Sequence, residues 1–256
     1  MQIGIIHQRK RKILRTERRS ICGISLDNGP MCFKPTKWSS GLLRVGRWCR
    51  CIILWDEACH DGRVDDLQRV LGYVDAVNAS QQIEQVGDEL FSMSCWTPQF
   101  CAALIRAAEA AGGFSAQPGD PVPGHEISLA LISPRLFEAV QDDMGMRIWP
   151  QLQQHWPLID YHGINDVFII KYEKGGQEEL RQHHDVAQVS ASVKLNDSYE
   201  GALLDFPRQK FTNEQLPVGS LLAWPSLVTH PHGSTPITSG IKYSLTIWFE
   251  LPISLS

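Results

Sequence analysis

The chain has 256 residues, of which 43% are hydrophobic and 20% charged, and its formal net charge at pH 7 is −4. These values are typical of a globular protein with one large domain or two smaller ones. The slightly acidic balance excludes a general affinity for nucleic acid or anionic membranes, and no apolar stretch is long enough to cross a membrane.

The first twenty residues are strongly basic. They contain Arg9, Lys10, Arg11, Lys12, Arg15, Arg18 and Arg19, with only Glu17 opposing them. We interpret this run as a solvated arm, with a contact to nucleic acid or to another partner as the less favoured alternative. It is not followed by the apolar region of a secretory signal, and we therefore expect a cytoplasmic protein.

The chain has seven cysteines, and an odd number without a secretory signal favours reduced thiols over a disulfide framework. Cys49, Cys51, Cys59 and His60 are close enough in the sequence to suggest a zinc site. Their spacing does not match a zinc module, so free thiols are the preferred interpretation and zinc binding the alternative.

Residues 1–92 are predicted to form an N-terminal α/β extension or accessory domain. Short strands are expected over residues 20–26, 30–34 and 43–55. An amphipathic helix is expected over 64–77, and the polar stretch 78–90 is the candidate linker to the next domain. This part of the sequence contains no catalytic constellation.

Residues 93–256 are predicted to form a second domain that begins with two helices. Thr97-Pro98 and Ser133-Pro134 each combine an N-cap hydroxyl with a proline at the first helical position. The first helix is expected to end at Gly112-Gly113, and the second to run to about Trp149-Pro150.

Short strands separated by turn residues follow these helices. They are expected over residues 166–173, 186–195, 201–206, 218–224 and 241–251. Helices followed by closely spaced strands predict an α+β fold, namely a double-stranded β-helix (jelly roll) with flanking helices.

Metal-ligating side chains occur at two places in this second domain. If residues 183–185 are extended, His183 and Asp185 point to the same face, because side chains alternate along a strand. A third imidazole from a distant strand, His232, would complete the 2-His-1-carboxylate set of non-haem iron oxygenases. His230 is the less favoured alternative for the third ligand.

Lys242 follows His232 by ten residues and shares one face of the final strand with Ser244 and Thr246. If that face looks into a barrel, the lysine is buried. A buried ammonium group requires an anionic partner, and the distal carboxylate of 2-oxoglutarate would serve.

The segments 172–185 and 230–243 resemble the catalytic domains of procollagen lysyl hydroxylases and, more broadly, of the prolyl 4-hydroxylase superfamily. That family places a histidine and an aspartate one residue apart, a second histidine about forty to fifty residues later, and a basic residue ten residues further on. Pro236 and Gly240 also match the family pattern. The resemblance covers about residues 93–252.

This resemblance implies an Fe(II)- and 2-oxoglutarate-dependent dioxygenase, with ascorbate as a further implied cofactor. Such an enzyme hydroxylates an unactivated C–H bond, here on a peptidyl lysine or proline side chain, and releases succinate and CO₂. Two alternatives stay open. One is hydroxylation of a free amino acid or small metabolite, and the other is a non-catalytic jelly-roll binding module.

The resemblance also assigns roles to individual residues. The implied iron ligands, which are also the catalytic residues, are His183, Asp185 and His232. Lys242 would pair with the C5 carboxylate of 2-oxoglutarate, and Tyr172 and Ser244 would help to hold this cosubstrate. Lysyl hydroxylases generally have an arginine at the position of Lys242, and this difference leaves the substrate open.

Overall fold

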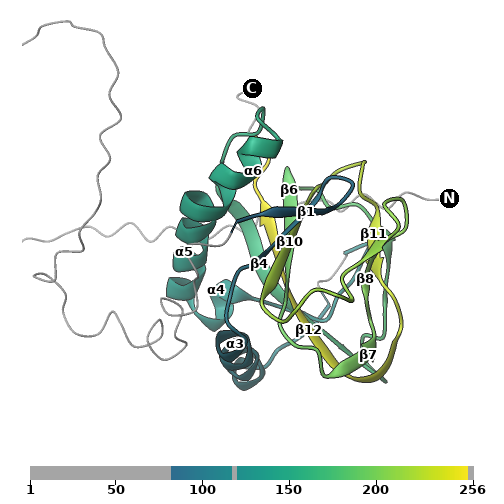
Figure 1. Ribbon diagram of the computed structural model, residues 1–256. Coiled ribbons are helices and arrows are strands. Elements are labelled where there is room, and N and C mark those ends of the chain that lie inside the picture. The colour runs from purple at the N-terminus through teal and green to yellow at the C-terminus, as the bar shows by residue number, and fades with distance from the viewer. Residues whose placement is uncertain (1–81, 117–119, 253–256) are drawn as a thin grey trace, which may run out of the picture. The chain divides into compact units, whose positions relative to one another are not determined.

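The computed structural model describes residues 82–116 and 120–252. The strands and the helix predicted before residue 78, the basic arm and the possible zinc site lie outside the described residues. Within them, helices cover one face of a large sheet, and a smaller sheet lies on its other face (Figure 1). This arrangement confirms the predicted jelly roll with flanking helices.

Both predicted helix starts are confirmed. The helices are α3 (Pro98–Ala111), α4 (Leu129–Ile132), α5 (Pro134–Asp143), the π-helical turn η1 (Met144–Ile148) and α6 (Trp149–His155). The Phe100 amide donates to Thr97 Oγ1 at 3.4 Å, and the Leu136 amide donates to Ser133 Oγ at 3.2 Å. Each hydroxyl satisfies an amide that has no partner within its helix.

The second predicted helix extends further than expected. It was predicted to end near Trp149-Pro150, but the helical path continues through η1 and α6 to His155. The Trp149 amide bonds to the Met144 carbonyl, five residues back, and this wider turn accommodates Pro150, which lacks an amide donor. The helix was predicted to end at this proline, but the π turn allows the helical path to continue beyond it.

Within the described residues, the strands form two antiparallel sheets. The larger sheet has the order β1-β2-β10-β6-β12-β4-β3, with β7 also paired to β12, and the smaller has the order β5-β11-β8-β9. The larger consists of β1 (Glu84–Gly87), β2 (Leu90–Ser94), β3 (Glu126–Ser128), β4 (Ile164–Glu173), β6 (Val189–Lys194), β7 (Tyr199–Gly201), β10 (Ser220–Pro225) and β12 (Ile237–Phe249). The smaller consists of β5 (Leu180–His183), β8 (Leu204–Phe206), β9 (Phe211–Thr212) and β11 (His232–Ser234).

Strands β1 and β2 correct the predicted linker over 78–90. β2 pairs with β10 in the larger sheet, and β1 pairs with β2, so the linker prediction is wrong from Glu84 onward. Strand β2 spans the predicted domain boundary after residue 92, and the role of residues 1–92 as a separate part stays a prediction. β1 is an edge strand with mostly exposed, polar side chains, and its sequence therefore resembles that of a linker.

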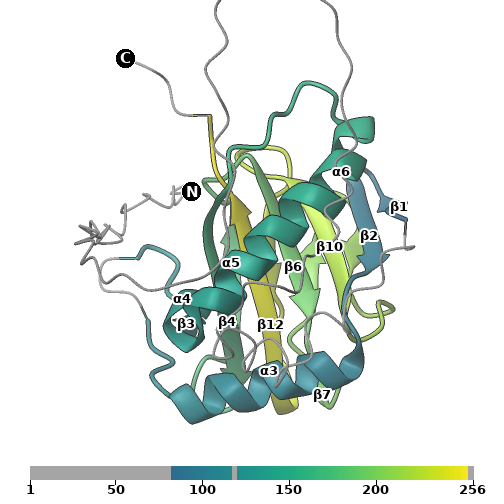
Figure 2. The same cartoon turned by 90° about the vertical axis from the view of Figure 1, so that its left-hand side faces the viewer.

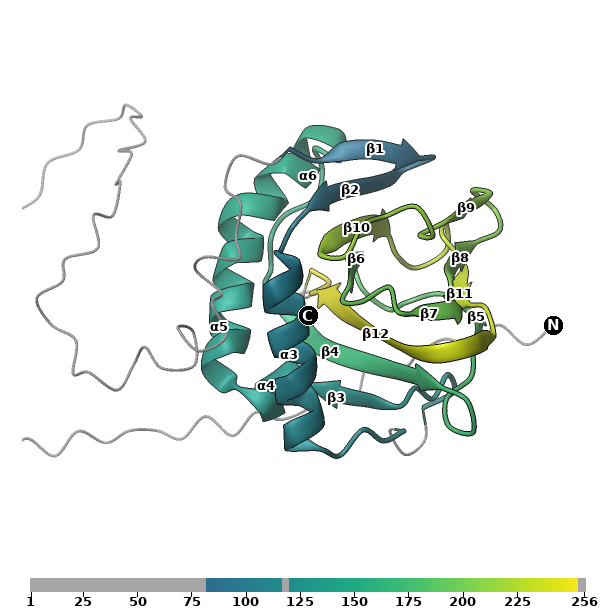
Figure 3. The same ribbon diagram turned by 60° about the horizontal axis from the view of Figure 1, so that its bottom comes forward.

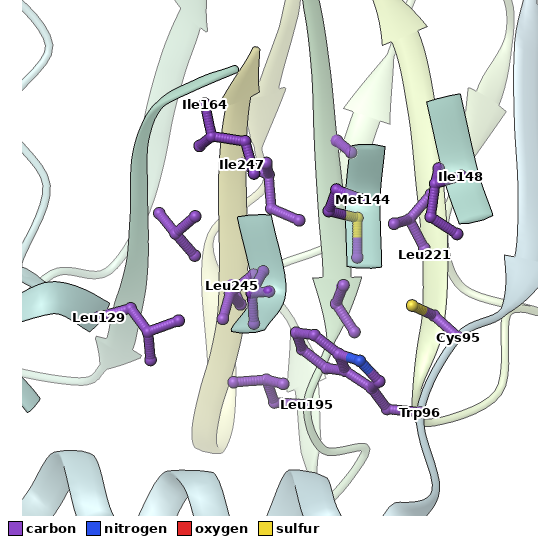
Figure 4. Packing of buried hydrophobic residues seen from close by; sticks show 14 of the residues in the cluster. Cys95, Trp96, Leu129, Met144, Ile148, Ile164, Leu195, Leu221, Leu245 and Ile247 are labelled. Atoms are coloured by element: carbon purple, nitrogen blue, oxygen red, sulfur yellow. The ribbon is translucent and has the colours of Figure 1, made fainter. Parts of the chain in front are cut away.

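The main hydrophobic core lies between the larger sheet and the helices. Helices α3, α5 and α6 lie across this face of the sheet (Figure 2). In Figure 4, Leu245 and Ile247 of β12 and Leu221 of β10 lie in one cluster with Met144 and Ile148 of η1. Each fully buried aliphatic side chain stabilises the fold by about 1.5–3 kcal/mol, so this layer holds the central strands in place.

The other face of β12 looks toward the smaller sheet (Figure 3). Because side chains alternate along a strand, Lys242, Ser244, Thr246 and Trp248 all point away from the helices. A row of mostly polar side chains therefore lies on a central strand inside the molecule. Such a row indicates a binding site and not a hydrophobic core.

Two further expectations concern the described part of the chain. Cys95 and Cys101 are both free and buried there, in agreement with reduced thiols. Among the described residues, no helix has the length and apolar character needed to cross a membrane.

Candidate metal centre and cosubstrate pocket

A pocket of about 630 Å³, counting its open mouth, lies between the two sheets. β4 and β12 of the larger sheet and β5 and β11 of the smaller sheet contribute to its lining. All six residues predicted for the site lie in this one pocket: Tyr172, His183, Asp185, His232, Lys242 and Ser244.

The predicted metal ligands converge on the smaller sheet. His183 is the last residue of β5 and lies directly opposite His232, the first residue of β11. Asp185 follows β5 immediately, and all three side chains are buried. Gly233 helps to bring the two strands together, because a Cβ atom there would lie only 2.7 Å from the Leu180 carbonyl oxygen.

The donor atoms of the triad have the separations that a metal ion requires. His183 Nε2 is 3.4 Å from Asp185 Oδ1, and His232 Nε2 is 3.5 Å from Asp185 Oδ2. Ligands about 2.1 Å from a shared ion lie on the order of 3 Å apart when they bind side by side. Asp185 Oδ2 is buried and has no hydrogen-bond partner within the described ranges, so the residues present fit a metal cation.

Backbone carbonyls orient both histidine rings. His183 Nδ1 lies 2.9 Å from the Arg181 carbonyl oxygen, and His232 Nδ1 lies 3.0 Å from the His230 carbonyl oxygen. A carbonyl can only accept, so each Nδ1 must donate, and in the neutral form of each ring Nε2 carries the lone pair on the side that faces Asp185. Such partners fix the tautomer and the orientation of metal-binding histidines.

The charges of the triad also suit a cation. Burial alone would raise the pKa of Asp185, but the facing His232 and His183 outweigh burial and hold that pKa well below its usual range. Burial lowers the pKa of His232 to about 4. At neutral pH the carboxylate is therefore ionised and the His232 imidazole is neutral, which are the forms that bind metals.

The structure places His232, and not His230, in the cluster with His183 and Asp185. His230 is buried, but both of its ring nitrogens have other partners, since Nδ1 lies 2.9 Å from Thr229 Oγ1 and Nε2 lies 3.0 Å from the Asp88 carbonyl oxygen. His184, between the two upstream ligands, is half-buried and lies outside the triad. Neither histidine is placed to bind the same cation.

Lys242 lines the same pocket and is almost completely buried. Its Nζ donates to the Ala202 carbonyl oxygen at 2.6 Å and to Ser234 Oγ at 3.3 Å. In the described part of the chain, no carboxylate forms an ion pair with it. Burial, with a smaller contribution from Lys194, lowers the pKa of Lys242 to about 7, and an anion bound beside it would restore the charge.

Tyr172 and Ser244 lie in the lining of the same pocket as this lysine. Tyr172 lies opposite Lys242 in the β4–β12 pair, and its hydroxyl hydrogen-bonds to Ser234, while burial raises its pKa. Ser244 follows on the same face of β12 and is also buried. Ser234 was not predicted from the sequence, although its position two residues after His232 places it on the same strand face.

Comparison with known proteins supports the same interpretation. The chain is 25% identical over 181 residues to the procollagen lysyl hydroxylase and glycosyltransferase of Acanthamoeba polyphaga mimivirus, covering 63% of this chain and 19% of that protein. It is 25% identical over 188 residues to a multifunctional procollagen lysine hydroxylase and glycosyltransferase of Caenorhabditis elegans, covering 67% of this chain and 25% of that protein.

The predicted resemblance to procollagen lysyl hydroxylases is confirmed. A human 2-oxoglutarate and iron-dependent oxygenase domain-containing protein 2 is also similar, with 23% identity over 196 residues, covering 66% of this chain and 52% of that protein. The chain thus spans about half or less of the length of these relatives. No family model matches the chain.

Solved structures give weaker similarities. A viral collagen prolyl hydroxylase of Paramecium bursaria Chlorella virus-1 superimposes with a TM-score of 0.46 at 16% identity, covering 63% of this chain and 95% of that one. A prolyl 4-hydroxylase of Phytophthora capsici superimposes with a TM-score of 0.48 at 16% identity, covering 63% of this chain and 58% of that one.

Proposed function

We propose that this chain is an Fe(II)- and 2-oxoglutarate-dependent dioxygenase that hydroxylates an unactivated C–H bond. The observation that carries the proposal is the presence, in one pocket, of a buried 2-His-1-carboxylate triad and a buried lysine without a carboxylate partner among the described residues. The triad would supply three ligands to a cation and would leave room for further ligands. The lysine supplies the positive charge that a carboxylate-containing ligand needs.

Different residues of the pocket would bind the metal ion and the cosubstrate. His183, Asp185 and His232 would hold Fe(II), which when bound supplies the redox chemistry that activates O₂. Lys242 would pair with the C5 carboxylate of 2-oxoglutarate, and the hydroxyls of Ser234 and Ser244, which line the same pocket, would help to orient it.

In this reaction, one atom of O₂ enters the C–H bond of the substrate and the other enters succinate, while the C1 carboxylate of 2-oxoglutarate leaves as CO₂. Apolar side chains, Phe168 and Ile170 among them, form part of the pocket lining. Exclusion of water strengthens the pairing of Lys242 with a carboxylate and limits side reactions.

For the substrate, we propose a lysyl side chain of a polypeptide. The similar proteins of mimivirus and Caenorhabditis elegans are named as hydroxylases of procollagen lysine, and two carboxylates, Asp120 and Glu126, line a wall of the pocket. A carboxylate near the path of the substrate favours a cationic side chain over a prolyl ring. Prolyl peptides and free lysine are the competing substrates for the test.

The first experiment is anaerobic addition of Fe(II) and 2-oxoglutarate to the full chain, followed by visible spectroscopy. A weak charge-transfer band is expected for wild type and for His184→Ala, which removes a histidine next to the ligands but outside the triad. Asp185→Ala is expected to lose the band and all succinate formation while keeping the wild-type circular dichroism spectrum.

A folded, iron-loaded wild type that gives no band would contradict the dioxygenase proposal. A band that forms normally but leads to no succinate with lysyl peptides, prolyl peptides or free lysine would favour the non-catalytic binding module. Activity retained by Asp185→Ala would move the metal site elsewhere in the chain.

A further inference from the structure

We propose that His230 is a positioning residue for His232, and that it connects the turn between β1 and β2 to the metal centre. The inference rests on the proposed metal site. It adds a role for a histidine that does not bind the metal, and for a hairpin that lies largely upstream of the region resembling the hydroxylases.

The His230 ring is held in place by hydrogen bonds at both of its nitrogens. The side chain is 3% exposed, and its Nε2 lies 3.0 Å from the Asp88 carbonyl oxygen. Because a carbonyl only accepts, Nε2 must carry the proton, which leaves Nδ1 to accept from the Thr229 hydroxyl at 2.9 Å. Both ring nitrogens are therefore satisfied, and the ring has one favoured orientation.

The His230 backbone contacts the proposed metal ligand His232. The His230 backbone carbonyl accepts from His232 Nδ1 at 3.0 Å, and this bond presents His232 Nε2 to Asp185. Pro231 stiffens the connection, because its ring fixes its own φ and restricts His230 to extended conformations. A change in the position of the His230 ring is thus transmitted to the carbonyl that orients His232.

The His230 ring also contacts the β1–β2 hairpin. Asp88 contacts the ring through its main-chain carbonyl, so the contact depends on the path of the β1–β2 turn and not on the Asp88 side chain. That path includes Glu89 in a left-handed conformation, with φ of +50°. On the other side of the loop, Gln209 Nε2 donates to the Thr229 carbonyl oxygen at 3.2 Å. The loop before His232 is therefore held from two directions.

The test measures Co(II) binding to the full chain, because Co(II) replaces Fe(II) without oxidation and reports its coordination through its visible absorption bands. His230→Phe retains a planar ring but removes both hydrogen bonds, and it is expected to weaken Co(II) binding by about tenfold to a hundredfold and to alter the Co(II) spectrum. His230→Gln, which can still donate to the Asp88 carbonyl, should recover much of the affinity. His184→Phe is the matched control and should bind as wild type does.

A purely structural role is distinguished by a second variant that leaves His230 unchanged. Insertion of one glycine after Asp88 displaces the carbonyl in an exposed turn, and it should also weaken Co(II) binding and alter the spectrum. If either folded variant, His230→Phe or the insertion, binds Co(II) with the wild-type affinity and spectrum, the inference is wrong. If His230→Phe does not fold, the insertion alone decides. Wild type that binds no Co(II) would instead overturn the proposed metal site.

Discussion

Lys242 and Tyr172 lie opposite each other in the antiparallel β4–β12 pair, with the Lys242 Nζ atom 4.6 Å from the centre of the Tyr172 ring. The face of an aromatic ring attracts a cation, and this attraction is strongest where water is excluded. The ring therefore replaces part of the hydration that Lys242 loses on burial, and it helps to keep a charge available for a carboxylate ligand.

Substitution of Tyr172 tests this contribution. Tyr172→Leu removes the ring and is expected to raise the KM for 2-oxoglutarate by about fivefold, which corresponds to roughly 1 kcal/mol of lost cation–π interaction. Tyr172→Phe keeps the ring and should stay within about twofold of wild type. Steady-state assays of succinate formation provide both values. Equal KM values for the leucine and phenylalanine variants would show that the ring face contributes nothing.

The affinity for 2-oxoglutarate should depend on pH through Lys242. Burial lowers the pKa of Lys242 to about 7 in the ligand-free protein, and only the protonated form pairs with the carboxylate. Below pH 7 the affinity is therefore expected to be constant, and above it the affinity should fall by up to tenfold for each pH unit.

Lys242→Arg supplies the control for this dependence, because a guanidinium group stays charged throughout the range. Its 2-oxoglutarate affinity should not change between pH 7 and 9, whatever its absolute value. Equilibrium titration in the presence of metal measures both proteins. A wild-type affinity that is as flat as that of the arginine variant would contradict the predicted deprotonation.

Glu126 is predicted to contribute to the choice of substrate. It lies on β3, opposite Ile170 of β4, and its side chain lines the pocket. Glu126→Gln should raise the KM for a lysyl peptide by about fivefold, the size expected for a partly exposed ion pair, without changing the KM for 2-oxoglutarate. Glu138→Gln, on the exposed side of α5, is the control. An equal effect of Glu126→Gln on lysyl and prolyl peptides would exclude recognition of the ammonium group.

Gly219 is predicted to be essential for the junction between β2 and β10. Its φ is +86°, and a Cβ atom would lie 1.9 Å from the Trp96 carbonyl oxygen. Gly219→Ala should therefore lower the free energy of unfolding by about 3 kcal/mol, as expected for a strained backbone in close contact. Gly112 also has a positive φ, +66°, but open space around it, so Gly112→Ala should cost only the backbone strain, about 1–2 kcal/mol. Denaturant titration of the two variants gives the comparison, and equal losses would contradict the steric explanation.

Much of the site could be predicted because its chemistry follows a local rule. His183 and Asp185 are two residues apart at the end of a strand, and Lys242 and Ser244 are two residues apart within another. The period-two alternation of side chains places each pair on one face. The helix starts at Thr97 and Ser133 could be predicted for a similar reason, since a hydroxyl followed by proline acts within a single turn.

The remaining features depend on contacts between distant segments. β1 is recognisable as a strand only through its pairing with β2, because its own side chains are mostly exposed. Glu126 enters the pocket because β3 pairs with β4, and nothing in the sequence near Glu126 indicates that pairing. The role of His230 depends on the Asp88 carbonyl, 142 positions away in the chain.

The metal ligands and the cosubstrate anchor belong to different layers of the molecule. His183, Asp185 and His232 are carried by the smaller sheet and the loop after β5, whereas Lys242 is carried by the larger one. The thickness of the sandwich sets the distance between the metal ligands and Lys242. Between the two sheets, Lys242 Nζ donates to Ser234 Oγ. Substitutions that alter the spacing of the layers should change how well a ligand of fixed length spans the site while the metal is still held. Selection for a different cosubstrate could thus act through packing residues remote from every donor atom.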